Sequence, residues 1–270
     1  TGTADSVALL DATTNVIAVS AVESVVATNS ASADTVTMLS AGALSVSGID
    51  NVIGTTASTD SLRLITAGDD VSLGADLSGS GISENDTDVV TMLADNTLSV
   101  SALDSVIGSG GNDAVRMMGG GTLNVDLIDT VIGGTSTTDV VHLTSTTSLS
   151  VSNVETVQGT TDTTDAVRML SAGTLATSAV DSVTGTSGNA DILQLAGSDG
   201  GAVSVSAIET VRGSAATDSV TLLASGGIAV SGVESVIGTS GADSLVYQSG
   251  GTVSVSSIET VTGTTGTGDV

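Results

Sequence analysis

The sequence repeats about every 26 residues, and this periodicity limits the possible folds more than any other feature. Each unit opens with an aspartate that is followed by alternating apolar residues, as in the segment from Asp88 to Met92. The ten leading aspartates are Asp5, Asp34, Asp60, Asp88, Asp113, Asp139, Asp165, Asp191, Asp218 and Asp243. A second acid follows 16 or 18 residues later, and a glycine follows that acid by four, as at Asp129 and Gly133. Such regular spacing predicts a repeat architecture.

Within each unit the apolar residues alternate with polar ones in the manner of β-strands. The unit from Asp139 has three such groups, namely Val141 with Leu143, Leu149 with Val151, and Val154 with Val157. Gly, Ser, Thr, Asn and Asp separate the groups, and these breaks prevent the apolar spacing of an amphipathic helix. Each unit is therefore predicted to form three short strands.

We predict an all-β fold, a parallel β-solenoid (β-helix) of about ten turns, with about 26 residues and three short strands per turn. Turns stacked about 4.8 Å apart would place equivalent residues of successive units above one another. Val115, Val141 and Val167 would then form one column of the core. The absence of proline agrees, because each wall residue needs its N–H for the ladder.

The repeats run along the whole chain, so residues 1–270 are expected to form one solenoid. The third unit is irregular, and residues 79–86 within it are expected to form a local loop. The chain opens and stops inside the repeat pattern, which predicts that it is a segment of a longer repetitive chain.

The composition excludes several classes of function. The chain carries 30 acids against 4 basic residues, and Tyr247 is its only aromatic side chain, so we expect no nucleic-acid partner. Cysteine is absent, which excludes a disulfide scaffold and a thiolate metal site. The apolar runs are too short for a membrane-spanning helix. His142 is the single histidine, and no serine has a plausible base near it in the sequence, so we do not expect an enzyme.

The acids are the main candidates for chemistry. With one unit per turn, carboxylates about 4.8 Å apart would repel by roughly 1 kcal/mol per pair in bulk water. Calcium could offset this repulsion, because it prefers oxygen ligands from flexible turns. The candidate calcium ligands are Asp34, Asp88, Asp113, Asp139, Asp165, Asp191, Asp218 and Asp243. The alternative is that each aspartate caps its own turn through a side-chain hydrogen bond. Calcium binding predicts that chelation lowers the melting temperature, whereas capping predicts no change.

Two of these turns resemble the repeats-in-toxin nonapeptide, G-G-x-G-x-D-x-U-x. They are Gly238-Thr239-Ser240-Gly241-Ala242-Asp243 and Gly108-Ser109-Gly110-Gly111-Asn112-Asp113, and both lack the second glycine of that motif. The resemblance implies a calcium-bound parallel β-roll. Here, however, the turn occurs once per 26 residues, whereas that family repeats it every nine residues.

The whole unit is similar to the long Thr-, Val- and Gly-rich repeat regions of bacterial surface proteins exported by type I secretion, including adhesins and surface-layer proteins. This resemblance implies an extracellular or bacterial cell-surface location. It also implies a structural role as part of a filament, surface layer or adhesin stalk that forms a homopolymer or associates laterally. The alternative function is a flat surface that binds a ligand or ice through serine ladders, such as those of Ser45 and Ser47 or of Ser204 and Ser206.

A second apolar residue often follows the last inward residue of the first strand. The set comprises Leu10, Leu39, Ile65, Leu93, Met118, Leu170 and Leu223, and a parallel set comprises Ile53, Ile107, Ile132 and Ile237. If these side chains face outward, they form apolar stripes that indicate contact with a partner. If the strand bends at this position, they belong to the core instead.

Overall fold

A computed structural model describes most of the chain. It covers residues 4–10, 14–27, 34–40, 42–49, 51–53, 61–64, 70–73, 89–92, 95, 97–100, 103–136, 138–145, 148–161, 164–188, 190–197, 200–249 and 251–263. Asp60, Asp88 and the loop predicted at residues 79–86 lie outside the described residues.

The described residues form short β-strands and no helix, which confirms the all-β prediction. The first fourteen strands are β1 (Ser6–Leu9), β2 (Val16–Val19), β3 (Ser24–Ala27), β4 (Thr35–Met38), β5 (Ala43–Ser47), β6 (Asn51–Ile53), β7 (Ser61–Leu64), β8 (Asp70–Leu73), β9 (Val89–Met92), β10 (Thr97–Val100), β11 (Ser105–Ile107), β12 (Ala114–Met117), β13 (Gly121–Asp126) and β14 (Thr130–Ile132). The others are β15 (Asp139–Leu143), β16 (Ser148–Ser152), β17 (Thr156–Gln158), β18 (Ala166–Met169), β19 (Thr174–Ser178), β20 (Ser182–Thr184), β21 (Ile192–Leu195), β22 (Ala202–Ser206), β23 (Thr210–Arg212), β24 (Ser219–Leu222), β25 (Gly227–Ser231), β26 (Ser235–Ile237), β27 (Ser244–Tyr247), β28 (Ser254–Ser256) and β29 (Thr260–Thr262).

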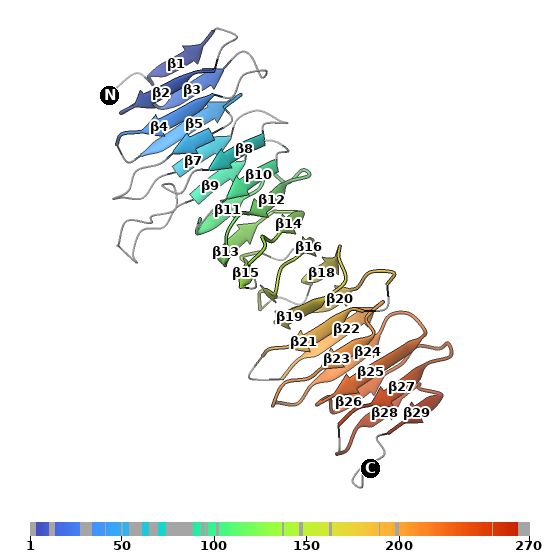
Figure 1. Ribbon diagram of the computed structural model, residues 1–270. Coiled ribbons are helices and arrows are strands. Elements are labelled where there is room, and N and C mark those ends of the chain that lie inside the picture. Colours follow the sequence, from blue (N-terminus) through green and yellow to red (C-terminus); the bar gives the residue numbers. More distant parts are fainter. Residues whose placement is uncertain are drawn as a thin grey trace. The chain divides into compact units, whose positions relative to one another are not determined.

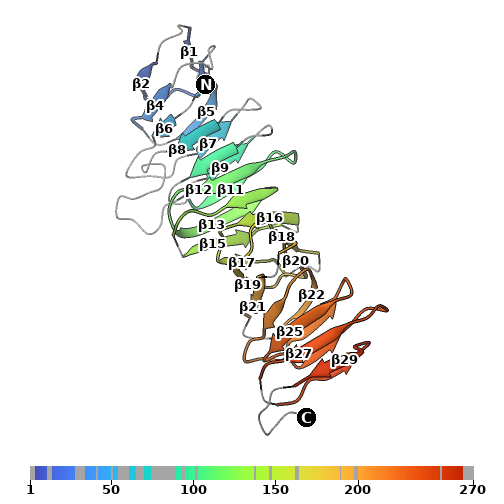
Figure 2. The same ribbon diagram turned by 45° about the vertical axis from the view of Figure 1, so that its right-hand side comes forward.

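The chain divides into two compact units, Thr1–Val141 and His142–Val270. Within each unit every strand pairs in parallel with the next strand but one, so that odd-numbered and even-numbered strands form separate ladders (Figure 1). In the second unit the odd ladder runs from β17 to β29 and the even ladder from β16 to β28. Figure 2 shows the same two stacks after a turn of 45°. The predicted parallel β-solenoid is therefore confirmed.

The pairing corrects the predicted composition of one turn. Val115 pairs with Leu98 on one side and with Val131 on the other, and not with Val141 of the next repeat. One coil thus holds two strands and 16 to 22 residues, as the pairs Val115 with Val131 and Val183 with Val205 show. The physical reason is that the three strands of a repeat have the same inward apolar pattern, so any of them can stack on any other.

Each regular repeat still supplies three strands, as β12, β13 and β14 do for the repeat from Asp113. Because a coil uses only two strands, two repeats build three coils, and the solenoid makes more turns than the ten repeats. The first strands of successive repeats consequently fall in opposite ladders. In the second unit β18 and β24 belong to the even ladder, whereas β21 and β27 belong to the odd ladder.

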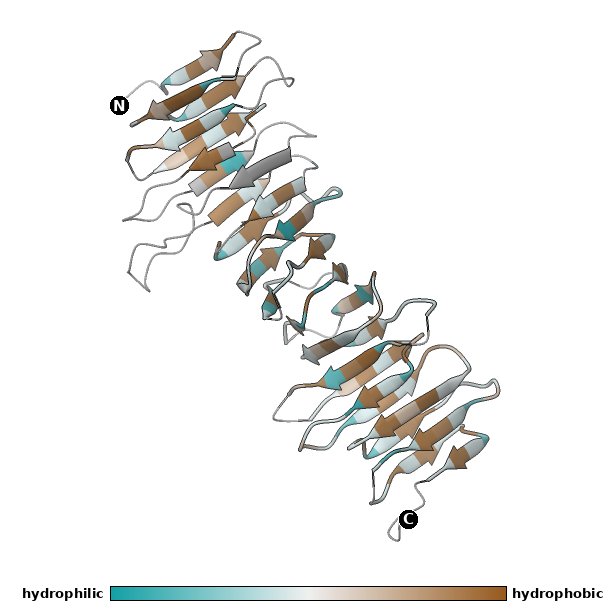
Figure 3. Cartoon of the chain, viewed as in Figure 1, coloured by the Kyte–Doolittle hydropathy of each residue, from teal (hydrophilic) through white to brown (hydrophobic). Residues whose placement is uncertain are grey.

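The core of each unit consists of aliphatic layers between the two ladders. Buried and partly exposed residues alternate along the strands, as in β22, where Val203 and Val205 point inward. The same alternation appears as brown and pale bands in Figure 3. Each fully buried Val or Leu contributes about 1.5–3 kcal/mol relative to an exposed side chain. This layering leaves the corners between the ladders as the places where polar side chains enter the wall.

Candidate functional site

The predicted metal-ligand aspartates are buried at the corners that lead into the first strand of each repeat. Asp34, Asp113, Asp139, Asp165, Asp191, Asp218 and Asp243 are each at most 2% exposed. Asp88 lies outside the described residues. A buried carboxylate has to be compensated by hydrogen bonds or by a cation, so its neighbours decide its role.

One carboxylate oxygen of these aspartates is bound within its own turn. Thr239 donates its backbone N–H (2.6 Å) and its hydroxyl (2.8 Å) to Oδ2 of Asp243. Ser214 donates the same two groups to Asp218 at 2.5 and 2.9 Å, and Thr186 donates them to Asp191 at 2.6 and 2.7 Å. This arrangement is the side-chain turn cap that was the alternative to calcium binding.

The other carboxylate oxygen binds the preceding coil. The N–H of Gly226 donates to Oδ1 of Asp243 at 2.9 Å, and the N–H of Gly201 donates to Oδ1 of Asp218 at 3.0 Å. One aspartate therefore fastens its own turn and the coil before it.

The second acid of each repeat lies one coil after the leading aspartate and binds it directly. The N–H of Asp218 donates to Oε2 of Glu234 at 2.7 Å, while the N–H groups of Glu234 and Ser235 donate to the carbonyl of Asp218, both at 3.1 Å. Asp243 and Glu259 repeat this arrangement. The 16-residue spacing in the sequence is therefore the length of one coil.

Three successive coils thus present glycine, aspartate and a second acid at the same corner. We call this arrangement the corner cycle, and Gly201, Asp218 and Glu234 are one example. Equivalent carboxylates recur at one corner only every third coil, about 14 Å apart. Their repulsion in bulk water is then about 0.3 kcal/mol instead of roughly 1 kcal/mol, and salt screens it further. Much of the electrostatic penalty that motivated the calcium hypothesis is absent.

The hydrogen bonds keep the buried carboxylate ionised. For Asp243, burial raises the pKa, but the hydroxyl and N–H of Thr239 and the N–H of Gly226 lower it further, and the net pKa lies below its ordinary value. The charged form is therefore the one that the corner stabilises.

No metal cluster is evident at these corners. Among the described residues, no three His, Cys, Asp or Glu side chains gather closely enough to hold a metal ion. The structure places the leading aspartates singly, with N–H and O–H donors pointing at their oxygens, and a cation would have to displace those donors. Calcium binding by these residues stays a prediction.

Two further corner positions have roles that the sequence interpretation missed. The residue before the buried Ile or Val of the corner has a left-handed backbone, with φ of 53° at Ala179 and 52° at Ala207. In the repeats with Gly48 and Gly232 the same position is glycine, which was the available signal. The glycine four residues after the second acid lies under the carbonyl of such a residue. A Cβ added at Gly185 would overlap the carbonyl oxygen of Ala207, one coil on.

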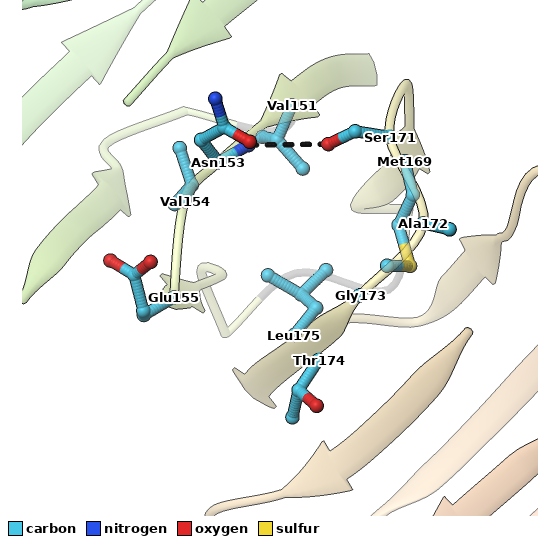
Figure 4. Close-up of a pocket in the computed structure, with 10 residues that line it drawn as sticks. All are labelled: Val151, Asn153, Val154, Glu155, Met169, Ser171, Ala172, Gly173, Thr174 and Leu175. Carbon is cyan, nitrogen blue, oxygen red and sulfur yellow. Dashed lines mark hydrogen bonds between the residues drawn. The ribbon is translucent and has the colours of Figure 1, made fainter. Parts of the chain in front are cut away.

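Shallow hollows open at the corners between coils. Figure 4 shows one of about 150 Å³, which has Val151, Met169 and Leu175 in its wall and Glu155 at its rim. The N–H of Asn153 donates to the hydroxyl of Ser171 across it at 3.4 Å. A similar hollow of about 290 Å³ contains Val205, Leu222 and Glu209. These hollows follow from the repeat, and their lining residues include no histidine, cysteine or lysine.

The serine pairs proposed for a flat binding surface do not form one continuous array. In the first unit Ser45 and Ser47 lie on β5 of the odd ladder, whereas Ser99 lies on β10 of the even ladder. In the second unit the neighbours of Ser204 on the even ladder are Ser182 and Thr221, and Ile237 follows Thr221. The half-turn offset between repeats separates residues that the sequence aligns.

The apolar residues after the first strand face outward wherever they are described. Leu10, Leu39, Met118, Leu170 and Leu223 are all exposed, while Ile65 and Leu93 lie outside the described residues. In the parallel set, Ile237 is exposed and Ile53, Ile107 and Ile132 are half-buried. The outward alternative is therefore confirmed for the first set.

Comparison of the chain with protein-family models, with curated proteins and with solved structures found no match in any of the three. In the part of the chain that the structure describes, no helix is long and apolar enough to cross a membrane.

Proposed function

We propose that this chain is a structural repeat region of an extracellular or bacterial cell-surface assembly, such as a filament, a surface layer or an adhesin stalk. The observation that carries the proposal is the corner cycle. Its acids, which are the main chemistry-bearing groups of the chain, bind the backbones of neighbouring coils. Side chains used in this way serve cohesion between coils and not the binding or turnover of a substrate.

The corner cycle gives each unit cohesion along its stack of coils. At one corner, Asp218 links three coils through the N–H of Gly201, the carboxylate of Glu234 and its own carbonyl. Hydrogen bonds that involve a charged group contribute about 1.5–3 kcal/mol each, more than those between neutral groups. These corner bonds add to the strand ladders, so that pulling two coils apart breaks both sets at once.

The construction also suits a chain of variable length. Each repeat contacts only its neighbours, so stability grows roughly in proportion to the number of repeats. Calcium belongs to the proposal as a second stabiliser, through the resemblance of the Asp113 and Asp243 turns to repeats-in-toxin motifs. The donors around the leading aspartates make hydrogen-bond capping the first explanation of their role.

Localisation on the producing cells tests this proposal without reference to calcium or to assembly. Antibodies raised against the purified chain should label intact cells, and an antibody against a cytoplasmic protein should label them only after permeabilisation. Labelling of the chain that also requires permeabilisation would overturn the proposed surface role.

A further inference from the structure

The second unit separates its charges from its sheet faces. On the even ladder the outward side chains of the strands include Ser150, Ser182, Ser204, Thr221 and Ile237, with no carboxylate among those described. Its acids lie in the turns, namely Glu155, Asp165, Asp181, Asp191, Glu209, Asp218, Glu234, Asp243 and Glu259 among the described residues. In a chain of net charge −26 this leaves neutral faces between acidic corners.

The two faces of this unit differ in their apolar content. The residue that follows the first strand is Leu170 after β18 and Leu223 after β24, both in the even ladder. The equivalent residues after β21 and β27 of the odd ladder are Ala196 and Gln248. Alternation between successive repeats in the sequence becomes segregation between faces, because one repeat occupies one and a half coils.

Ile237 extends the apolar stripe on the even ladder. Its strand partner is Thr221, and Leu223 is two residues further along the strand of Thr221 on the same side. Leu170, Leu223 and Ile237 are 46%, 56% and 40% exposed. We call the outward surface of the even ladder in His142–Val270, with these three residues and its serine and threonine rows, the even face.

We propose that the even face is the contact surface for a second copy of this chain, packed face to face. The inference rests on the proposed structural function and names the partner for it. The even face is the surface on which another copy can approach without burying a carboxylate. Approach through the acidic corners would bring like charges together, which costs several kcal/mol when they are desolvated.

The repeat period also favours a copy over an unrelated partner. Leu170 and Leu223 lie on β18 and β24, which are three ladder steps apart, or about 14 Å. A second copy carries the same spacing, so both leucines of one face can contact the matching stripe of the other at the same time. Arg168, which lies on this face two residues before Leu170, can then reach an acidic corner of the copy.

The area predicts a weak contact for one unit alone. Seven strands about 4.8 Å apart and about 10 Å of strand width give roughly 340 Å² per copy, well below the ~800 Å² per partner of a stable interface. Association should therefore depend on concentration and strengthen with the number of repeats in register. It should also strengthen with salt, which screens the repulsion between two chains of the same charge.

Sedimentation equilibrium of the whole chain, over a range of protein and salt concentrations, tests the contact. One variant carries Leu170→Lys and Leu223→Lys on the even face. The matched control carries Ala196→Lys and Gln248→Lys, at the equivalent exposed positions of the odd ladder. Both variants add two positive charges, so they have the same effect on the net charge.

We expect the wild-type mass to rise with concentration and the association constant to fall at least tenfold in the even-face variant only. Circular dichroism should show the same β structure in all three proteins. An equal loss in both variants, no loss in either, or a wild-type chain that stays monomeric at millimolar concentration would overturn the proposal. A monomeric chain that still labels intact cells would overturn this inference alone, whereas labelling only inside cells would overturn the surface role alone.

Discussion

At the scale of single residues, the corner glycines decide whether two neighbouring coils can close on each other. The glycine four residues after the second acid lies under a carbonyl of the next coil, at Gly159, Gly185, Gly213 and Gly238. At Gly213 an added Cβ would overlap the carbonyl oxygen of Gly232 and lie 2.9 Å from Oδ2 of Asp218. Close approach of the backbone, and not an unusual φ, thus excludes a side chain here.

We therefore expect Gly213→Ala to destabilise the chain by about 1–3 kcal/mol, because a methyl group is forced into a closed contact. Gly201→Ala is the matched control, since a Cβ there has no atom within 4 Å and the N–H that binds Asp218 is kept. Urea unfolding measures both, and the control should change stability by less than about 0.5 kcal/mol. Equal effects of the two substitutions would contradict the close-approach explanation.

The buried aspartates make stability depend on pH. The pKa of Asp243 is lower in the folded chain than its ordinary value, so the folded state favours the ionised carboxylate. Its contribution is fully present above the pKa of the unfolded chain, near 3.9, and is lost as the pH falls through the lower folded pKa. The sign therefore predicts acid destabilisation beginning below about pH 5.

Denaturant unfolding at a series of pH values checks this prediction. Asp243→Asn should reduce the slope of stability against pH in the acid range, because the substituted side chain no longer titrates. Ser244→Asn, at the exposed neighbouring position, is the control and should keep the wild-type slope. An unchanged slope in Asp243→Asn would show that another group causes the acid sensitivity.

At the scale of the elements, the three strands of a repeat are interchangeable stacking partners. In the even ladder β18 and β20 come from one repeat and β22 from the next, yet Val167, Val183 and Val205 follow one another inward. A coil therefore closes after two strands without regard to the boundary of the repeat. This property makes the number of repeats determine the face on which a residue lies.

Deletion of residues 191–217, which is one repeat, tests that property. The repeat from Asp218 would follow the repeat from Asp165, and all strand pairings and corner cycles would have equivalents in the wild type. Leu223 would move to the face opposite Leu170. We expect a cooperative unfolding transition and β-type circular dichroism, together with weaker association in sedimentation equilibrium.

The outcome of this deletion separates two coil lengths. If one repeat made one complete turn, the deletion would leave Leu223 on its original face and association would be unchanged. Unchanged association would thus contradict the coil of two strands, provided that the wild-type chain associates.

At the scale of the whole molecule, the question is how a chain of net charge −26 remains folded. The corner cycle spaces equivalent acids by three coils, and backbone N–H groups compensate the buried ones. Both features reduce the need for bound cations.

We accordingly expect the chelator EDTA to leave the melting temperature unchanged at constant ionic strength, as measured by differential scanning calorimetry. A fall in melting temperature that calcium reverses and an equal concentration of magnesium does not would contradict capping as the full explanation. That result would support the calcium sites first predicted at the leading aspartates.

Much of this protein could be predicted from its sequence, because the information is local. Alternating apolar residues predict strands, the lack of proline agrees with continuous ladders, and the regular spacing predicts a parallel solenoid. The leading aspartates were found for the same reason, since an aspartate before a strand is a local turn signal. The left-handed backbone at Ala207 was missed because alanine gives no such signal.

The tertiary structure decided which residues are neighbours. Strands with the same apolar pattern can pair in several registers, and only closure of the core between two ladders selects the coil of two strands. That selection places Glu234 next to Asp218, spaces equivalent carboxylates three coils apart and gathers Leu170 and Leu223 on one face. Local sequence determines what each strand is, whereas the choice of partner depends on packing between residues that are distant in the chain.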